Sequence, residues 1–166
     1  MDITIHQGWV PGAIGDIAAL HARHYAESHG FDAFFEAKVA RELGEFLLRL
    51  DPARDLFRCA VAGGRVLGSI ALDCGEDPAS AHLRWFVLDA SLRGRGLGRR
   101  WLEEAIAQAR RAGAPQVHLW TLAGLDAAGH LYEQAGFSLV EEIKAEQWGR
   151  RVTERRLVMP LGRAGR

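Results

Sequence analysis

The sequence predicts one mixed α/β domain over residues 1–161, followed by a flexible tail at 162–166. Three observations support this fold class. Strand-like and helix-like hydrophobic patterns alternate along the chain, a strand, loop, helix and strand follow one another in its middle, and no internal repeat or low-complexity linker interrupts its 166 residues. A chain of this length buries roughly two thirds of the surface that its unfolded form exposes, which is enough for one core.

The beginning of the chain predicts a strand and two helices. Residues 2–7, DITIHQ, alternate apolar and polar side chains as a strand does, and Pro11-Gly12 then breaks the pattern. A helix is expected over residues 14–28. Asp32 is a suitable N-cap for a second helix, whose apolar side chains recur at helical spacing until Asp51-Pro52 stops it.

The rest of the chain predicts a hairpin, then strands that alternate with helices. Gly63-Gly64 favours a two-residue hairpin turn because both central residues of such a turn need positive φ. Residues 81–89, AHLRWFVLD, are apolar enough for a central strand. The remaining predicted elements are a helix from Leu97 that closes at Gly113, a strand at 116–122, a helix at 125–135, and two strands at 137–147 and 151–161.

Charge and cysteine content exclude several classes of function. The chain has 21 basic and 21 acidic residues, so it lacks the general positive charge that binding to nucleic acid or an anionic membrane requires. The only cysteines, Cys59 and Cys74, fall in apolar stretches and are expected to be buried thiols rather than a disulfide. The chain has no signal-peptide pattern and no apolar run of about 18 residues, so a cytoplasmic protein is expected.

Residues 92–106, LRGRGLGRRWLEEAI, place glycines and arginines directly before a helix. The first amides of a helix lack internal partners and favour anions, and glycine lets a phosphate approach them closely. A Walker loop would need Lys followed by Ser or Thr, and a dinucleotide loop would need glycine where Arg99 stands, so neither an NTPase nor an NAD enzyme is favoured. The predicted phosphate loop comprises Gly94, Gly96 and Gly98, with Arg93, Arg95, Arg99 and Arg100 as further donors.

The pattern Arg93-x-x-Gly96-x-Gly98, followed later by LYEQAGF at residues 131–137, resembles the GNAT N-acetyltransferase superfamily. In amino-acid sequence, the two segments are most similar to the acetyltransferase half of MarR-type two-part regulators, here without a regulator domain. The resemblance implies a GNAT-like fold with a mixed, mostly antiparallel sheet of about six to seven strands, about four flanking helices and one splayed strand pair. It also implies acetyl-CoA as co-substrate.

The resemblance assigns the contacts with the cofactor. The strand before the loop would splay from its neighbour and hold the pantetheine arm through the backbone groups of Phe86 and Leu88. A backbone N–H near Leu88 would meet the oxyanion. The residues assigned to cofactor binding are Phe86, Leu88, Arg93, Gly94, Arg95, Gly96, Gly98 and Arg99.

His82 is the predicted general base, with a water relay as the alternative. Some GNAT enzymes carry a glutamate at this position, and a histidine with a pKa of about 6.5 can take a proton from an amine. Strand alternation predicts that His82 shares one face with Arg84, Phe86 and Leu88. Asp73 and Asp89 are weaker candidates, since each stands at a strand end where it can shape a turn.

Tyr132 is the predicted general acid. In the family, the tyrosine of the Leu-Tyr pair protonates the departing thiolate of CoA, and that tyrosine matches Tyr132. A typical member also carries asparagine seven residues earlier, where this chain has Leu125. That departure puts the exact cofactor contacts in doubt and keeps a second function open.

The acceptor site is expected along the two helices that follow the first strand, where Glu27, Asp32 and Glu36 would suit a cationic amine, with Trp148 as a further wall residue. His21 and His24 are three residues apart, but no third ligand follows at a zinc spacing, so no metal is predicted.

The residues and the resemblance together imply an enzyme that transfers the acetyl group of acetyl-CoA to a primary amine by direct attack in a ternary complex. The acceptor would be a small-molecule or peptide amine, and a different acyl group stays open. The alternative is a non-catalytic acyl-CoA-binding sensor or regulatory module. Nucleic acid and membrane are not expected as partners, and a homodimer stays open.

Overall fold

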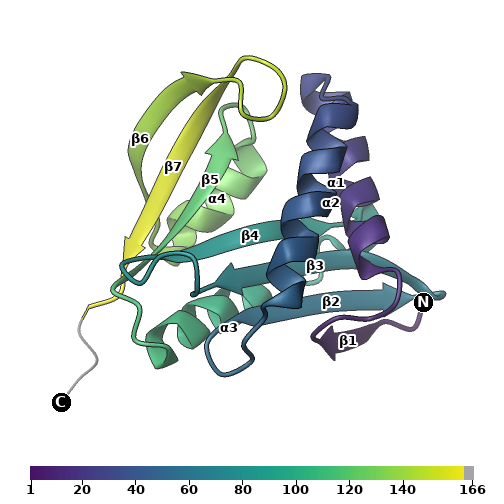
Figure 1. Cartoon of the computed structure of the whole chain (residues 1–166), viewed down its shortest axis with the longest axis horizontal. Helices are drawn as coiled ribbons and strands as arrows, with labels where there is room; N and C mark the ends of the chain where they lie inside the picture. The colour runs from purple at the N-terminus through teal and green to yellow at the C-terminus, as the bar shows by residue number, and fades with distance from the viewer. Residues whose placement is uncertain (163–166) are drawn as a thin grey trace.

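The computed structural model describes residues 1–162 and consists of one twisted sheet with helices on both of its faces (Figure 1). The predicted tail lies outside the described residues except for Gly162. The helices are α1 (Ala13–His29), α2 (Ala33–Leu48), α3 (Leu97–Arg111) and α4 (Asp126–Ala135). The strands are β1 (Thr4–Gln7), β2 (Leu56–Ala62), β3 (Arg65–Asp73), β4 (Ala81–Leu88), β5 (Gln116–Leu122), β6 (Ser138–Ala145) and β7 (Val152–Pro160).

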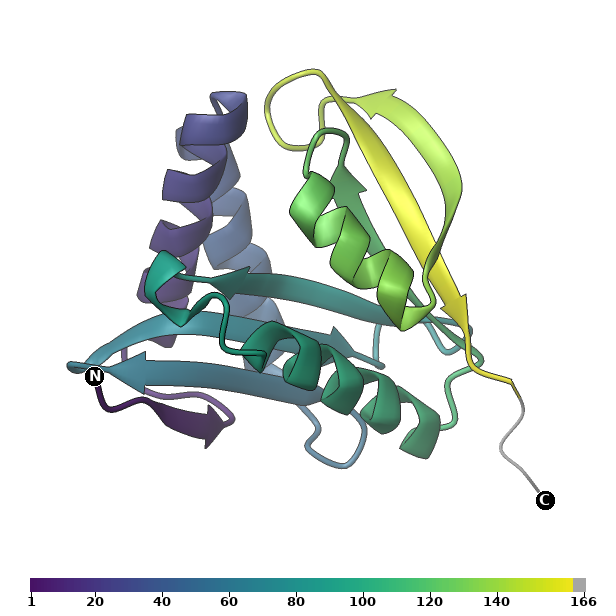
Figure 2. The ribbon, with the colours of Figure 1, turned by 180° about the vertical axis from the view of Figure 1, so that it is seen from behind.

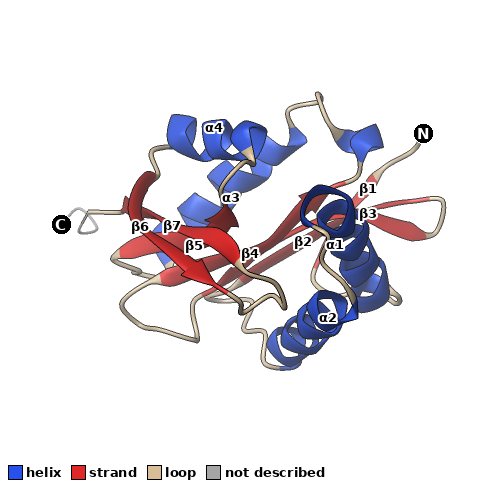
Figure 3. Ribbon diagram, turned by 90° about the horizontal axis from the view of Figure 1, so that it is seen from above, coloured by secondary structure: helices blue, strands red, loops and turns tan. Residues whose placement is uncertain are grey.

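The sheet has seven strands in the order β1-β2-β3-β4-β5-β7-β6. The β4–β5 pair is parallel and the other pairs are antiparallel. Seen from above, α1 and α2 cover one face of the sheet, whereas α3 and α4 cover the other (Figure 3). This arrangement confirms the predicted mixed, mostly antiparallel GNAT-like fold.

Local sequence signals account for the boundaries of these elements. The side chain of Asp32 accepts a hydrogen bond from the Phe34 amide at 3.1 Å and caps α2 as expected. Gly63 and Gly64 adopt φ values of 58° and 74°, which the predicted hairpin turn between β2 and β3 requires. A short 3₁₀ helix, η1 (Ala90–Leu92), was not predicted; it begins where Asp89 accepts a hydrogen bond from the Ser91 amide.

The sheet opens between β4 and β5. The two strands pair only at Ala81 with Val117 and at His82 with His118. Beyond these residues β4 and β5 diverge, as Figures 1 and 2 show from opposite sides. The predicted splayed strand pair is therefore confirmed.

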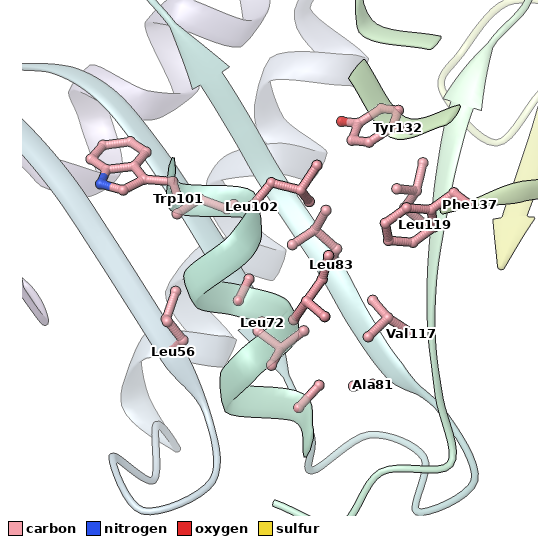
Figure 4. Packing of buried hydrophobic residues seen from close by; sticks show 14 of the residues in the cluster. Leu56, Leu72, Ala81, Leu83, Trp101, Leu102, Val117, Leu119, Tyr132 and Phe137 are labelled. Carbon is pink, nitrogen blue, oxygen red and sulfur yellow. The ribbon is translucent and has the colours of Figure 1, made fainter. Parts of the chain in front are cut away.

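Two hydrophobic cores lie on the two faces of the sheet. The core beneath α3 and α4 contains Leu72, Leu83, Trp101, Leu102 and Phe137, and Figure 4 shows how these side chains interlock between α3 and the strands. The core beneath α1 and α2 is built around Phe35, Phe46, Phe57 and Leu122. Because each face has its own core, the gap between β4 and β5 is framed by packed side chains on both sides.

β4 contains a bulge. After the bulge, the residues that alternation would place on one face of the sheet lie on the other. Ala71 of β3 pairs with Arg84 and Ser69 pairs with Val87, so β4 carries one extra residue in this interval. Trp85 has a φ of 46°, in the left-handed region, and its carbonyl accepts a 2.6 Å hydrogen bond from the Ser69 hydroxyl.

The bulge makes one sequence prediction wrong. Arg84 contacts Glu42 of α2, whereas Phe86 and Leu88 pack against the core beneath α3. His82, two residues from Arg84 in the regular part of β4, lies on the α2 side. His82 and Arg84 therefore do not share a face with Phe86 and Leu88, because alternation holds only within an unbroken strand.

Candidate functional site

A cavity of about 760 Å³ lies where β4 and β5 diverge. Its wall includes side chains of α1 and α2, both splayed strands, the start of α4 and the turn between β6 and β7. Among the predicted site residues, His82, Phe86, Leu88, Arg93, Gly98 and Tyr132 line it. The structure thus brings most of the predicted site together around one space, and the phosphate loop leads into it through Arg93 and Gly98.

The loop before α3 has the geometry that anion binding by amides requires. Gly94 and Gly96 have φ values of 73° and 75°, and a Cβ at either position would meet no atom within 4 Å. The Arg100 amide donates to the Gly96 carbonyl at 3.1 Å. The amides of residues 96–99, ahead of that bond, are the ones that a helix leaves without internal partners. The positive φ values therefore explain why glycine, and not a residue with a Cβ, stands at positions 94 and 96.

Gly98 serves a different purpose. It is already helical, and a Cβ there would lie 3.3 Å from Leu88 Cδ1 and 3.5 Å from Phe86 Cζ. The missing side chain lets the first turn of α3 pack closely on the splayed part of β4. The phosphate loop is thereby held against the strand that is predicted to bind pantetheine.

The predicted arginines differ in their contacts. Arg93 Nε donates to the Leu88 carbonyl at 3.2 Å, so its guanidinium lies between the loop and β4. Arg99 is exposed and pairs with Glu103 one turn along α3, with Nε 3.3 Å from Oε1. Arg95 is exposed. Arg93 is thus the arginine of the loop that is tied to the cavity.

The splayed edge of β4 offers the Leu88 N–H to a ligand, whereas the Leu88 carbonyl already accepts from Arg93 Nε. The Asp89 amide donates to the Leu67 carbonyl of β3 at 2.8 Å. Alternation then directs the N–H and C=O groups of Leu88 toward the opposite edge, from which β5 has diverged. An extended chain can add there as an additional strand would.

Tyr132 lies on α4 and is buried, with its ring between those of Phe86 and Phe137 at centroid distances of 6.3 and 5.8 Å. Its hydroxyl points away from Phe137 (Figure 4). Burial raises the pKa of Tyr132 well above its usual value, and Tyr25 across the cavity adds to this effect. The phenol is therefore protonated at neutral pH and able to donate a hydrogen bond or a proton.

His82 is paired with a carboxylate and stacked on a second histidine. Its Nδ1 lies 3.0 Å from Glu76 Oε2, and its ring stacks on that of His118 at 4.4 Å. Burial lowers the pKa of His82, while the hydrogen bond that His82 donates to Glu76 opposes that shift and Arg84 adds to it. The imidazole is thus neutral near pH 7, with Nδ1 held by Glu76 and Nε2 left to accept a proton.

The carboxylates that line the cavity are not the ones predicted for an acceptor site. Glu27, Asp32 and Glu36 are exposed and do not contribute to the cavity wall, because they lie on the solvent side of their helices. Glu42 of α2 and Glu76 of the turn before β4 line it instead. Sequence reasoning missed both. Glu42 has one local signal, its i,i+4 spacing from Lys38, but its second partner, Arg84, is distant in the chain.

Other candidate groups have structural roles. Asp73 is fully buried and forms a two-point ion pair with Arg49, and Asp89 caps η1. Cys59 and Cys74 are buried free thiols outside the cavity wall, and burial raises the pKa of each to about 11. His21 Nδ1 bonds to the Ile17 carbonyl at 2.9 Å.

Between residues 1 and 162, no three His, Cys, Asp or Glu side chains gather as a metal site would need. Over the same residues, no helix combines the length and the apolar character needed to cross a bilayer.

The chain is similar to one protein family and to a known relative. The model of the Acetyltransferase (GNAT) family matches residues 22–137. An uncharacterized N-acetyltransferase of Methanocaldococcus jannaschii is 29% identical over 138 residues, which cover 79% of this chain. The chain spans 59% of the length of that relative.

Solved structures of low sequence identity share the fold. An acetyltransferase from Streptococcus agalactiae superposes with a TM-score of 0.74 at 21% identity, covering 96% of this chain and 98% of that one. The yncA protein of Salmonella typhimurium, solved with its cofactor acetyl-CoA, gives 0.66 at 16% identity over 100% and 98% of the two chains. The ribosomal-protein-S18-alanine N-acetyltransferase of Escherichia coli gives 0.67 at 21% identity over 99% and 97%.

These relatives lend no support to the closer likeness with MarR-type two-part regulators. The family match instead covers the C-terminal part of α1, all of α2, the hairpin, the splayed strand, the loop before α3 and the LYEQAGF segment. On the strength of that match and of the fold, the chain belongs to the GNAT acetyltransferase family.

Proposed function

We propose that this chain is an acetyl-CoA-dependent N-acetyltransferase that acts on a primary amine by direct transfer in a ternary complex. The observation that carries the proposal is the single cavity that the predicted pantetheine edge, His82 and Tyr132 share, reached from the amide-rich start of α3. Family membership supports the choice of acetyl-CoA, and yncA shows a protein of this fold with that cofactor.

The loop before α3 and the open edge of β4 have the groups that binding of acetyl-CoA would require. Gly94 and Gly96 leave open space where a phosphate would approach the amides, and Arg93 can pair with its oxygens. The backbone groups of Phe86 and Leu88 would bind the pantetheine amides along the open edge of β4. A bound acetyl-CoA supplies an activated thioester, which these contacts would direct into the cavity.

His82 would accept the proton of the attacking amine. An amine with a pKa of about 10.4 is protonated at neutral pH and must lose its proton before it can attack. The neutral imidazole of His82 lies in the cavity wall on the acceptor side of β4, and Glu76 would stabilise the imidazolium that forms. Since the Glu76 side chain is 51% exposed, the proton can pass from this pair to solvent.

Tyr132 would donate to the departing sulfur of CoA, and a backbone amide near Leu88 would stabilise the oxyanion. Neither cysteine contributes to the cavity wall, and both thiols are protonated at neutral pH. Direct transfer to the amine is therefore favoured over a cysteine acyl-enzyme.

The test is to mix the protein with acetyl-CoA and a panel of primary amines and to follow the release of free thiol. Thiol release that depends on an amine supports the proposal. Tight binding of acetyl-CoA without turnover on any amine would contradict it and would favour a sensor or regulatory module.

A further inference from the structure

We propose that the acceptor is a small primary amine whose body is an aromatic ring. This inference rests on the proposed acetyltransferase function and assigns the substrate class of the same cavity. Here the acceptor end means the part of the cavity between α1, α2 and the β6–β7 turn. The inference follows from the aromatic side chains that line this end, from the turn that spans it, and from the ion pairs that already engage its charged groups.

The acceptor end has a wall of aromatic side chains, Tyr25, Phe31, Phe35 and Trp148, which we call the aromatic wall. Phe35 is at its centre, with ring centroids 5.1 Å from Tyr25, 5.0 Å from Phe31 and 5.6 Å from Trp148. All four side chains line the cavity. Aromatic rings pack favourably on one another edge-to-face or offset, so this wall suits a flat ring better than a thin alkyl chain.

The turn between β6 and β7 ties the acceptor end to the helices. Arg150 Nη1 donates to the Gly30 carbonyl at 3.0 Å, across the junction of α1 and α2. Two residues earlier in that turn, Trp148 packs on Phe35. With the turn fastened in this way, the acceptor end of the cavity suits a small molecule rather than an extended peptide.

The charges near the aromatic wall are already paired. Lys38 Nζ lies 2.9 Å from Glu42 Oε1, and Arg84 Nη2 lies 2.5 Å from Glu42 Oε2, so both carboxylate oxygens are engaged. The Lys38 ammonium also lies 5.5 Å from the centroid of the Trp148 ring. A second ammonium on the acceptor would have to displace Lys38 or Arg84, which disfavours polyamines and lysine-rich peptides.

One carboxylate could support a rival acceptor. Glu154 of β7 is fully buried, and its Oε2 has no hydrogen-bond partner among residues 1–162. Its Oε1 accepts from the side chain of Gln147, which lines the cavity. A diamine could pair its second ammonium with Glu154 if Gln147 moved aside, so a diamine belongs in the test.

The experiment compares kcat/KM for 2-phenylethylamine, n-butylamine, cadaverine and a lysine-containing peptide at saturating acetyl-CoA. The expected result is a kcat/KM for 2-phenylethylamine at least about tenfold above that for each other amine. A higher value for cadaverine, the peptide or n-butylamine would overturn the inference while leaving the acetyltransferase function intact. Binding of acetyl-CoA with no turnover on any amine would overturn both.

Variants of the aromatic wall sharpen the test. Trp148→Ala should lower the ratio of kcat/KM for 2-phenylethylamine to that for n-butylamine by about tenfold, mainly through KM, and Trp148→Phe should largely restore it. Trp9→Ala is the matched control, because Trp9 is 56% exposed and lies outside the cavity wall. An unchanged ratio in Trp148→Ala, with acetyl-CoA affinity retained, would contradict the assigned wall.

Discussion

His82 Nδ1 lies 3.0 Å from Glu76 Oε2. Both residues line the cavity, and the Glu76 side chain is also exposed to solvent. Glu76 is in the turn before β4, and its pKa is lowered by the hydrogen bond with His82. Because the carboxylate is ionised and holds Nδ1, the imidazole is oriented with Nε2 as its proton acceptor. Glu76 thus acts as a positioning residue for the proposed base.

The pH profile should depend on Glu76. Burial lowers the pKa of His82 from 6.5, so the acid limb of kcat/KM is expected to have its midpoint below that value. The hydrogen bond that His82 donates to the Glu76 carboxylate raises the same pKa, so Glu76→Gln should move the midpoint to still lower pH. The readout is the shift between variants, because the acceptor amine titrates as well. Glu45→Gln is the control, because it removes an exposed carboxylate outside the cavity, and its pH profile should match that of the wild type. If the two variants have the same pH profile, His82 is not the base.

Tyr132→Phe should separate chemistry from binding. The variant keeps the ring that packs between Phe86 and Phe137 but lacks the donor for the departing thiolate. We expect kcat to fall about 100-fold while the Kd for CoA stays within about twofold of the wild type. Rapid-mixing kinetics and equilibrium titration measure the two quantities. Retention of full kcat would exclude the acid role.

The bulge in β4 should matter for turnover through Ser69. Its hydroxyl bonds to the Trp85 carbonyl at 2.6 Å, and Ser69→Ala leaves that carbonyl without this donor. We expect the free energy of unfolding to fall by about 1 kcal/mol and kcat to fall about tenfold, because the Leu88 amide shifts from the oxyanion position.

Ile70→Val is the control for this experiment. Ile70 is the fully buried neighbour of Ser69, and shortening it costs a similar free energy of unfolding, about 1 kcal/mol, without removing the hydrogen bond. Its kcat should match the wild type. Equal losses of kcat in the two variants would show that general destabilisation, and not the bulge, lowers activity.

Stability should decline in mild acid. Burial lowers the pKa of His21 and of His118 from 6.5 to about 4. Between these pH values the unfolded chain binds protons that the folded chain does not, so the free energy of unfolding falls as pH decreases from 6.5 to about 4. The buried His21 accounts for roughly 3 kcal/mol of this loss, and His118 adds to it. Urea denaturation at a series of pH values measures it. His118→Asn should give a shallower slope, and a flat wild-type profile would contradict the buried neutral state of both histidines.

The sequence predicted most of the fold because its signals are local. The Gly63-Gly64 turn, the Asp32 cap and the start of α3 at Leu97 each depend on a few adjacent residues, and each is confirmed. The family assignment from the Gly96 loop and the LYEQAGF segment is confirmed as well.

The failures involve contacts between distant segments. Alternation placed His82 on the same face as Phe86, but a bulge that depends on Ser69 and on the packing of Trp85 against Phe46 reverses the strand. The sequence predicts acceptor carboxylates at Glu27, Asp32 and Glu36, whereas Glu76 lines the cavity from the turn before β4. The roles of His82, Tyr132 and the phosphate loop stay predictions.

Gly96 and Gly113 flank α3 with similar backbone conformations. Their φ values are 75° and 77°, and a Cβ at either position would meet no atom within 4 Å, so a side chain at either position is strained to a similar extent. They differ in place, since Gly96 precedes the first amides of the helix whereas Gly113 follows its last turn.

Calorimetric titration of CoA into Gly96→Val and Gly113→Val therefore tests the diphosphate site most directly. If the loop amides bind the diphosphate, Gly96→Val should weaken binding at least about tenfold while Gly113→Val binds CoA as the wild type does. Equal affinities in the two variants, or no binding to the wild type, would contradict the account.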